Sequence, residues 1–382
     1  MTGSSQPSRR QVIGLAVIVA ALLVAGTDGW IIHHFGANAA TRQYPDNYLN
    51  AIACPNAVQC WAVGQVASAP GGNTLSESRG PLLRLETAGH WRTVAVRGLP
   101  ARKDALKAIA CPGASDCWAV GGSSAGGPAI IDHWTGGAWQ LAPSPALDGG
   151  QLNDVSCASA SACWAIGGAQ SHTGTTRDIL EQWNGSVWSV ATTVGGGLQP
   201  EQISCPAAGR CLALGLLGGA PAAASYSGGH WKAMPAPAPP LVPGGSLQPP
   251  ASTGFDAGLV PSLFGCASPT LCLAAFPGSH PVTDTWNGRN WTPAATSLPA
   301  YPVDLTCSGA DGCWLLGMTD KSRPLALRWQ GGGWAPVTVH APHHHGYLSA
   351  LACGNRCWVV GGTGGTRGNG APYTYPLIES VP

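Results

Sequence analysis

The sequence predicts an all-β fold built from repeated four-stranded sheets, and three observations lead to that prediction. Cysteines recur in pairs, a glycine turn flanked by tryptophans recurs between the pairs, and helical periodicity is absent between residues 49 and 382. Self-similarity at such a period is typical of solenoids and propellers. Because helical periodicity is absent, a helical solenoid is disfavoured.

Fourteen cysteines mark the repeats. They form pairs that recur every 41 to 61 residues, six of them spaced C-x5-C and the last spaced C-x3-C. An even count with every cysteine in a short local pair predicts disulfides and an oxidising compartment. The alternative is zinc ligation, but one pair per repeat supplies only half of a structural zinc site. The predicted bridges are Cys54–Cys60, Cys111–Cys117, Cys157–Cys163, Cys205–Cys211, Cys266–Cys272, Cys307–Cys313 and Cys353–Cys357.

The second repeat shows the strand order most clearly. Leu106–Cys111 and Cys117–Gly122 are predicted as two strands joined by a turn, so that the cysteine bridge links this hairpin. Ala129–Trp134 is the third strand, and a glycine turn leads to the fourth, Trp139–Leu141. Seven repeats of four strands predict a seven-bladed β-propeller in which each blade has a disulfide-linked first hairpin.

The first strand of each repeat is expected to be innermost. The residue before each first cysteine is small, which suits strands that converge near an axis where bulky side chains would collide. The residue one position further back is apolar and is expected to pack between blades. The small residues are Ala53, Ala110, Ser156, Ser204, Gly265, Thr306 and Ala352.

Residues 1–26 are predicted to be a signal peptide or an uncleaved signal anchor. Arg9 and Arg10 precede an apolar run, Val12–Val24, which is short for a membrane span and resembles a signal-peptide core. Residues 27–48 are an N-terminal segment, and residues 49–382 are the propeller. The protein is therefore expected to be extracytoplasmic, either secreted or tethered to the membrane through its N-terminal segment.

The last repeat has one strand fewer than the others, because the chain stops at Pro382 after a single strand at Tyr373–Ser380. Trp30 matches no repeat position. Gly29–Phe35 is therefore a candidate fourth strand that pairs with Leu377–Ser380 and closes the ring. The alternative makes Trp30 an interfacial anchor of the export segment, and the sequence leaves both interpretations open.

At Cys117–Gly122, followed by Ile131–Trp134 and Trp139, the repeat resembles a kelch repeat. In that family a hydrophobic strand ends in Gly-Gly, and the next two strands carry an aromatic pair across a turn. The repeat also resembles secreted bacterial propeller proteins built from Cys-Trp-Ala-Val-Gly and Trp-Asn-Gly-x-x-Trp units. The resemblance covers residues 49–380 and implies the propeller fold. Its motifs are structural, so no activity follows from it.

Composition restricts the partners. Only 10% of the residues are charged and the formal net charge is +1, so no basic surface for nucleic acid is predicted. Membrane contact is expected only through the N-terminal segment, and a monomer is expected. No catalytic residue and no cofactor site is identified.

Ligand recognition is predicted on the face opposite the disulfides. The first-to-second and third-to-fourth turns share one face, whereas the second-to-third loops and the connections between repeats share the other. The latter are the variable parts of the chain, and loops on a rigid scaffold commonly carry recognition. They are Ala67–Pro81, Arg97–Lys107, Gln170–Asp178, Met234–Val260, Asp320–Arg323 and His340–Tyr347.

His340, His343 and His345 are weak candidates for metal ligands, since neutral imidazoles bind transition metals. A solvated polar loop is the favoured alternative, because neighbouring histidines on a loop cannot all face one ion.

Asp154, Gln202 and Asp304 occupy equivalent points on first strands, where they are candidates to line the channel mouth. The favoured alternative is that they are polar groups hydrogen-bonded within the channel.

The favoured function is an exported, noncatalytic binding or scaffold protein that recognises a cell-surface polysaccharide or protein. The alternative is a glycan-processing hydrolase or lyase whose carboxylates come from separate blades. Carboxylates clustered at one channel mouth would favour the enzyme, and an aromatic or apolar surface would favour binding.

Overall fold

The structure is a computed structural model, in which the described residues are 46–68, 77–95, 104–123, 127, 129–145, 150–170, 176–191, 197–218, 220–237, 263–276, 282–294, 298–309, 312–319, 323–337, 346–353, 356–366 and 372–381. The chain divides into Met1–Tyr44 and Pro45–Pro382, and all described residues belong to the second part. Every regular element among them is a β-strand. In the part of the chain that is described, no helix with the length and apolarity of a membrane span occurs.

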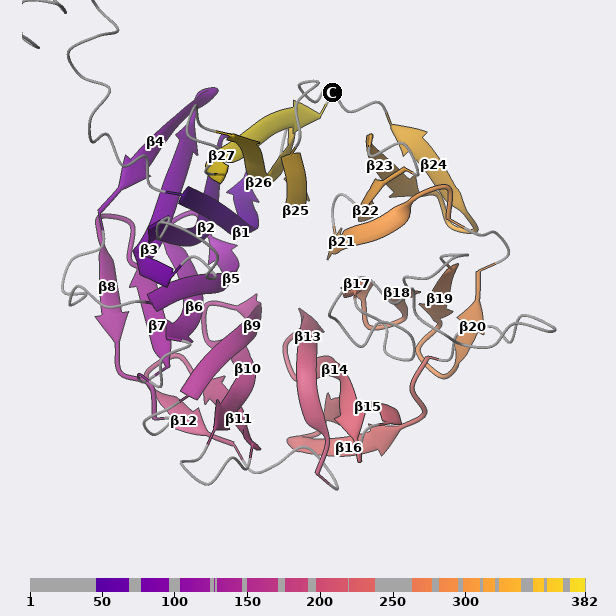
Figure 1. Ribbon diagram of the computed structural model, residues 1–382. Helices are drawn as coiled ribbons and strands as arrows, with labels where there is room; N and C mark the ends of the chain where they lie inside the picture. Colours follow the sequence, from indigo (N-terminus) through magenta and orange to yellow (C-terminus); the bar gives the residue numbers. More distant parts are fainter. Residues whose placement is uncertain are drawn as a thin grey trace, which may run out of the picture. The chain divides into compact units, whose positions relative to one another are not determined.

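The strands follow one another as antiparallel hairpins, and each cysteine pair belongs to one repeat of them (Figure 1). Repeat 1 comprises β1 (Asp46–Asn56), β2 (Gln59–Ser68), β3 (Glu77–Thr87) and β4 (His90–Val94). Repeat 2 comprises β5 (Asp104–Gly113), β6 (Asp116–Ser123), β7 (Ile130–Trp134) and β8 (Trp139–Ala142). Repeat 3 comprises β9 (Gly150–Ser159), β10 (Ala162–Gln170), β11 (Thr176–Trp183) and β12 (Trp188–Val190). Repeat 4 comprises β13 (Gln199–Ala207), β14 (Arg210–Leu217), β15 (Ala220–Ser227) and β16 (His230–Met234). Repeat 5 comprises β17 (Leu263–Ser268), β18 (Leu271–Phe276), β19 (Val282–Trp286) and β20 (Trp291–Pro293). Repeat 6 comprises β21 (Tyr301–Ser308), β22 (Gly312–Met318), β23 (Pro324–Trp329) and β24 (Trp334–Val337). Repeat 7 comprises β25 (Gly346–Cys353), β26 (Cys357–Thr366) and β27 (Pro372–Val381).

The sheets differ from a set of seven separate four-stranded blades. Repeats 2 and 3 share one eight-stranded sheet through a single bridge between Gly122 and Gln151. Gly122 permits this close approach because a side chain there would lie 2.9 Å from the Gly150 carbonyl oxygen. Repeat 7 contributes a three-stranded sheet in the described residues.

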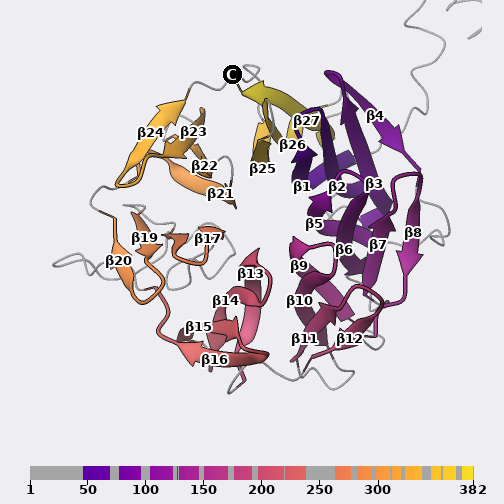
Figure 2. The same cartoon turned by 180° about the vertical axis from the view of Figure 1, so that it is seen from behind.

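The first strands lie side by side around a common axis (Figures 1 and 2). β1 contacts β5, β5 contacts β9, and the series continues through β13, β17, β21 and β25, which contacts β1 again. The first strand of each repeat is thus innermost, as the small residues before the first cysteines predicted. This radial arrangement of antiparallel sheets is that of a β-propeller.

Small residues precede the first cysteines because neighbouring inner strands approach closely. A side-chain carbon added at Gly265 would lie 3.2 Å from Cys307 Sγ in the next repeat. The apolar residues one position further back are all buried, as predicted. They are Ile52, Ile109, Val155, Ile203, Phe264, Leu305 and Leu351.

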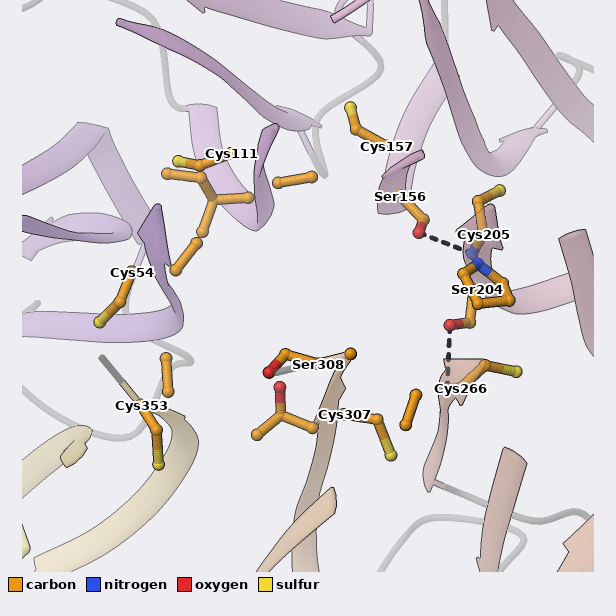
Figure 3. Close-up of a pocket in the computed structure, with 18 of the residues that line it drawn as sticks. Cys54, Cys111, Ser156, Cys157, Ser204, Cys205, Cys266, Cys307, Ser308 and Cys353 are labelled. Atoms are coloured by element: carbon orange, nitrogen blue, oxygen red, sulfur yellow. Dashed lines mark hydrogen bonds between the residues drawn. The ribbon is translucent and has the colours of Figure 1, made fainter. Parts of the chain in front are cut away.

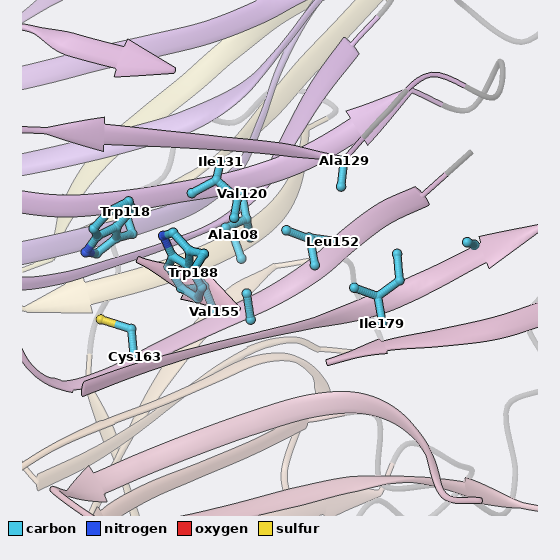
Figure 4. Packing of buried hydrophobic residues seen from close by; sticks show 12 residues of the cluster. Ala108, Trp118, Val120, Ala129, Ile131, Leu152, Val155, Cys163, Ile179 and Trp188 are labelled. Atoms are coloured by element: carbon cyan, nitrogen blue, oxygen red, sulfur yellow. The ribbon is translucent and has the colours of Figure 1, made fainter. Parts of the chain in front are cut away.

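Tryptophans pack between neighbouring repeats, as Trp118 and Trp188 do between repeats 2 and 3 (Figure 4). Trp118 follows the second cysteine of repeat 2, and its ring lies 4.6 Å from Trp183 and 5.2 Å from Trp188, which flank the turn of repeat 3. Each such contact joins one repeat to the next, and the one between Trp358 and Trp91 joins repeat 7 to repeat 1. The equivalent contacts are Trp61 with Trp134 and Trp139, Trp164 with Tyr226 and Trp231, and Trp358 with Trp91.

All seven predicted disulfides are present, and no cysteine of the described chain is free. Each bridge links the end of a first strand to the start of the second strand. In repeat 3, for example, Cys157 lies directly opposite Cys163 in the antiparallel pair. The thiolates that a zinc site would need are therefore consumed.

Several predictions concern residues outside the described part of the chain. They include the export signal of residues 1–26, the candidate closing strand Gly29–Phe35 with Trp30, and most of the variable loops. These remain predictions. β1 begins at Asp46, before residue 49, where the sequence placed the start of the propeller.

Candidate binding site at the mouth of the channel

Three cavities follow one another along the inner strands. The first, of about 400 Å³, lies at the disulfide end and is lined mainly by the first strands of all seven repeats. The second, of about 330 Å³, shares Ile52, Ile109 and Thr306 with the first. The third, of about 700 Å³, opens at the opposite end and is called the mouth cavity below.

The disulfide end offers little chemistry. The first cysteine of each pair lies around this cavity (Figure 3), and no described residue in its lining is charged. Its serines serve the scaffold, because Ser156 Oγ accepts a hydrogen bond from Cys205 N at 2.9 Å and Ser204 Oγ accepts one from Cys266 N at 3.1 Å. Both bonds join neighbouring inner strands.

In the second cavity, which lies between the other two and is called the middle cavity below, two aspartates also join neighbouring repeats through hydrogen bonds to the backbone. Asp154 Oδ1 accepts a hydrogen bond from Val155 N, and its Oδ2 accepts one from Ile203 N of the next repeat, both at 2.8 Å. Asp304 Oδ2 accepts a hydrogen bond from Leu351 N of the next repeat at 2.7 Å. The expectation that these carboxyls are hydrogen-bonded within the channel is confirmed.

Burial shifts the ionisation of both aspartates. Loss of solvent raises the pKa of Asp154 to about 7, the charge of Asp304 adds to the rise, and the backbone N–H groups oppose it. Loss of solvent likewise raises the pKa of Asp304 to about 6 against its backbone hydrogen bonds. Near neutral pH a fraction of each carboxyl is therefore protonated.

A β-bulge recurs on the inner strands, four residues before the first cysteine. The pairing register with the second strand shifts there in six repeats. A bulge leaves one residue out of the ladder and redirects its side chain. The bulged residues are Asn50, Lys107, Asn153, Glu201, Val303 and Ser349.

Glycines on the second strands make room for the bulges. A side-chain carbon at Gly64 would overlap the carbonyl oxygen of Tyr48, and one at Gly121 would overlap that of Ala105. The glycines that end the Cys-Trp-Ala-Val-Gly units therefore have a steric cause.

Four bulged side chains from consecutive repeats line the mouth cavity, namely Asn50, Lys107, Asn153 and Glu201. Asn50 Nδ2 donates to the Leu106 carbonyl oxygen at 2.8 Å, and Lys107 Nζ donates to Asn153 Oδ1 at 3.0 Å. Each bond runs to the next repeat, so the side chains are oriented before any ligand binds. Burial lowers the pKa of Lys107 and raises the pKa of Glu201.

Tyrosines occupy the position six residues before the first cysteine in three neighbouring repeats. Tyr48 lines the mouth cavity, and Tyr301 stands at the equivalent register in repeat 6 with 46% of its surface exposed. Tyr347 holds the same register in repeat 7, which lies between them in the ring.

The sequence identified only part of this site. Gln202 lines both the middle and the mouth cavities, and Lys107 belongs to the predicted variable segment Arg97–Lys107. The candidate metal ligands His340, His343 and His345 lie outside the described residues. Within the described ranges no group of three or more His, Cys, Asp or Glu residues could hold a metal ion.

No protein-family model and no curated protein matches the chain. Solved structures similar in fold include YCF48 bound to D1 peptide, at 14% identity and a TM-score of 0.52 over 83% of this chain and 91% of that one. The WD40 β-propeller domain of Doa1 matches at 8% identity and a TM-score of 0.52, over 89% and 94% of the two chains. YCF48 from Cyanidioschyzon merolae matches at 12% identity and a TM-score of 0.51, over 87% and 96%. At such identities the likeness shows the β-propeller fold alone.

Proposed function

We propose that this protein is an exported, noncatalytic binding or scaffold propeller of seven blades that holds a cell-surface glycan or protein at its mouth cavity. The observation that carries the proposal is the row of bulged side chains, which project hydrogen-bonding groups from four consecutive inner strands into one cavity.

The mouth cavity suits recognition because its polar groups are held in place. Asn50 and Lys107 are oriented by bonds to the next repeat, so a ligand orders fewer side chains when it binds. The disulfide end has no charged lining among the described residues, which supports binding at the opposite end.

The disposition of the carboxyls favours binding over catalysis. A glycoside hydrolase of the usual kind needs two carboxyls that both face the substrate. Asp154 and Asp304 each commit an oxygen to the backbone of the next repeat, which leaves Glu201 as the carboxylate of the described mouth lining. A hydrolase or lyase remains the alternative outcome of the test below.

Export and blade number rest on separate support. Disulfides in every repeat fit an oxidising compartment outside the cytoplasm, as does the signal-like segment of residues 1–26. A ring of seven blades is supported by the circular order of contacts among the first strands and by the contact between Trp358 and Trp91. The kelch-like character of the repeat remains a prediction.

A protein ligand has support from the comparison, since one structure of similar fold is YCF48 bound to D1 peptide.

The test is binding of the exported protein to arrays of glycans and peptides, with product analysis on every hit. Lys107→Ala is expected to weaken binding by about tenfold or more, because it removes a charged hydrogen-bond donor. Lys232→Ala is the matched control, since Lys232 is exposed on the outer strand β16. Equal binding by both variants would place the ligand elsewhere, and released products would identify an enzyme.

A further inference from the structure

We infer that the mouth cavity takes a neutral oligosaccharide, whose hydroxyls bond to the bulged side chains while sugar rings pack against Tyr48 in the lining and against the exposed Tyr301 at the same strand level. The inference rests on the proposed function and names the ligand class of the same cavity.

The lining of the mouth cavity is polar almost throughout. Of its eight described residues, Ala105 alone is aliphatic and Tyr48 alone is aromatic, while the others are four amides, one lysine and one glutamate. Protein partners are usually held by aromatic or aliphatic anchors that fill dry pockets. The described lining has no such pocket, whereas a sugar chain presents hydroxyls that both donate and accept hydrogen bonds.

The spare hydrogen-bonding capacity of the bulged side chains matches hydroxyl groups. Lys107 Nζ uses one donor on Asn153 Oδ1, and a lysine ammonium has three. Among the residues that the structure describes, the amide N–H groups of Asn153 are left available, and so is Oδ1 of Asn50, whose Nδ2 donates to Leu106 O. Donors and acceptors therefore alternate along neighbouring strands, and a row of sugar hydroxyls can satisfy both kinds.

Tyr48 and Tyr301 supply the apolar part of the site. Three of the seven tyrosines in the chain stand at one level of the inner strands, Tyr301, Tyr347 and Tyr48, in three adjacent repeats. Tyr301 is 46% exposed and packs into no described hydrophobic cluster. A tyrosine ring offers a flat apolar face and a polar tip, which suits the C–H face of a sugar beside its hydroxyls.

Charge selects a neutral sugar over an acidic one. Lys107 and Glu201 are the charged residues of the described mouth lining, and their charges cancel when both are ionised. An acidic glycan would be attracted by the ammonium group of Lys107 and repelled by the carboxylate of Glu201. A neutral chain bonds to both without a charge imbalance.

The experiment uses the exported full chain, with neutral hexose and N-acetylhexosamine oligosaccharides, uronic-acid oligosaccharides and a peptide library as probes. Saturation-transfer NMR and calorimetry measure binding at up to millimolar concentration. Neutral oligosaccharides are expected to bind, and Asn153→Ala and Tyr301→Ala to weaken that binding by about tenfold each. Tyr301→Phe keeps the ring and is expected to lose less than about threefold. Asn290→Ala, in an exposed turn, is the matched control with unchanged affinity and melting temperature.

The outcomes separate this inference from the proposed function. Peptide binding that depends on Lys107, without oligosaccharide binding, overturns the inference and keeps the proposed function. Binding of uronic-acid chains alone overturns the neutral ligand. Oligosaccharide binding that neither Asn153→Ala nor Tyr301→Ala weakens overturns the site itself, and no binding of neutral oligosaccharides at millimolar concentration overturns the ligand class.

Discussion

Asp132 on β7 carries a carboxyl group that is shielded from solvent and has no hydrogen-bond partner among the described residues. Its side chain is fully buried, and both carboxyl oxygens lack partners there. The same register is occupied by Ala224 in repeat 4 and by Leu327 in repeat 6, so the fold accepts an uncharged residue at this point. We expect Asp132→Asn, which keeps the shape and removes the titration, to change how stability depends on pH.

The size of the effect follows from the pKa of Asp132, which burial, with a contribution from the charge of Asp104, raises from 3.8 to about 7. The folded protein keeps the proton between these pH values, whereas the unfolded chain loses it. The stabilisation from this group is therefore complete below about pH 4 and is lost as the pH rises through 7. With about 1.4 kcal/mol for each pH unit, the loss amounts to about 4 kcal/mol.

The assay is urea-induced unfolding of the wild type and of Asp132→Asn at pH 4 and pH 8, followed by tryptophan fluorescence. The free energy of unfolding of the variant, relative to the wild type, is expected to rise by up to about 4 kcal/mol between the two pH values. A difference between the two proteins that is the same at both pH values would refute the argument, because it would mean that Asp132 titrates alike in the folded and unfolded states.

Three further changes test the scaffold. Trp118→Ala removes a buried indole from the contact between repeats 2 and 3 and is expected to cost roughly 3–5 kcal/mol in denaturant unfolding; a cost below about 1 kcal/mol would contradict the packing. Replacing Cys157 and Cys163 by alanine opens a short loop and is expected to cost about 2 kcal/mol, with an unchanged melting temperature as the contrary result. Gly121→Ala would overlap the neighbouring first strand and is expected to abolish soluble expression, whereas Gly137→Ala meets no atom within 4 Å and should fold normally; equal yields would disprove the steric role.

The sequence predicted the scaffold well because its signals are local. A cysteine pair marks a hairpin only a few residues long, and a tryptophan-flanked glycine turn such as Trp134–Trp139 marks the next. Small residues such as Gly265 located the axis, since the close approach that they permit is a property of the first strand itself. The bridge between Gly122 and Gln151 could not be foreseen, because it depends on how two repeats meet.

The mouth cavity was harder to predict because a bulge breaks the alternation on which strand prediction depends. Lys107 and Asn153 follow no period of two, so their common orientation is not visible in the residues themselves. The signal lies across the ladder in Gly121 and Gly167, whose missing side chains make room for the bulge. Searching four residues before each first cysteine would have found the site.

In repeats 1 to 4 the recurring bulge separates the residues that build the ring from those that line the mouth cavity. The glycine on the second strand maintains the bulge, while the bulged position itself holds an amide, a lysine, a carboxylate, a valine or a serine in different repeats. At the four bulged positions that line the mouth cavity, a new side chain changes the lining and leaves the strand ladder as it was, because the bulged residue takes no part in the ladder. The bulges of repeats 1 to 4 therefore offer a set of positions at which the lining of the cavity can be changed without redesigning the strands.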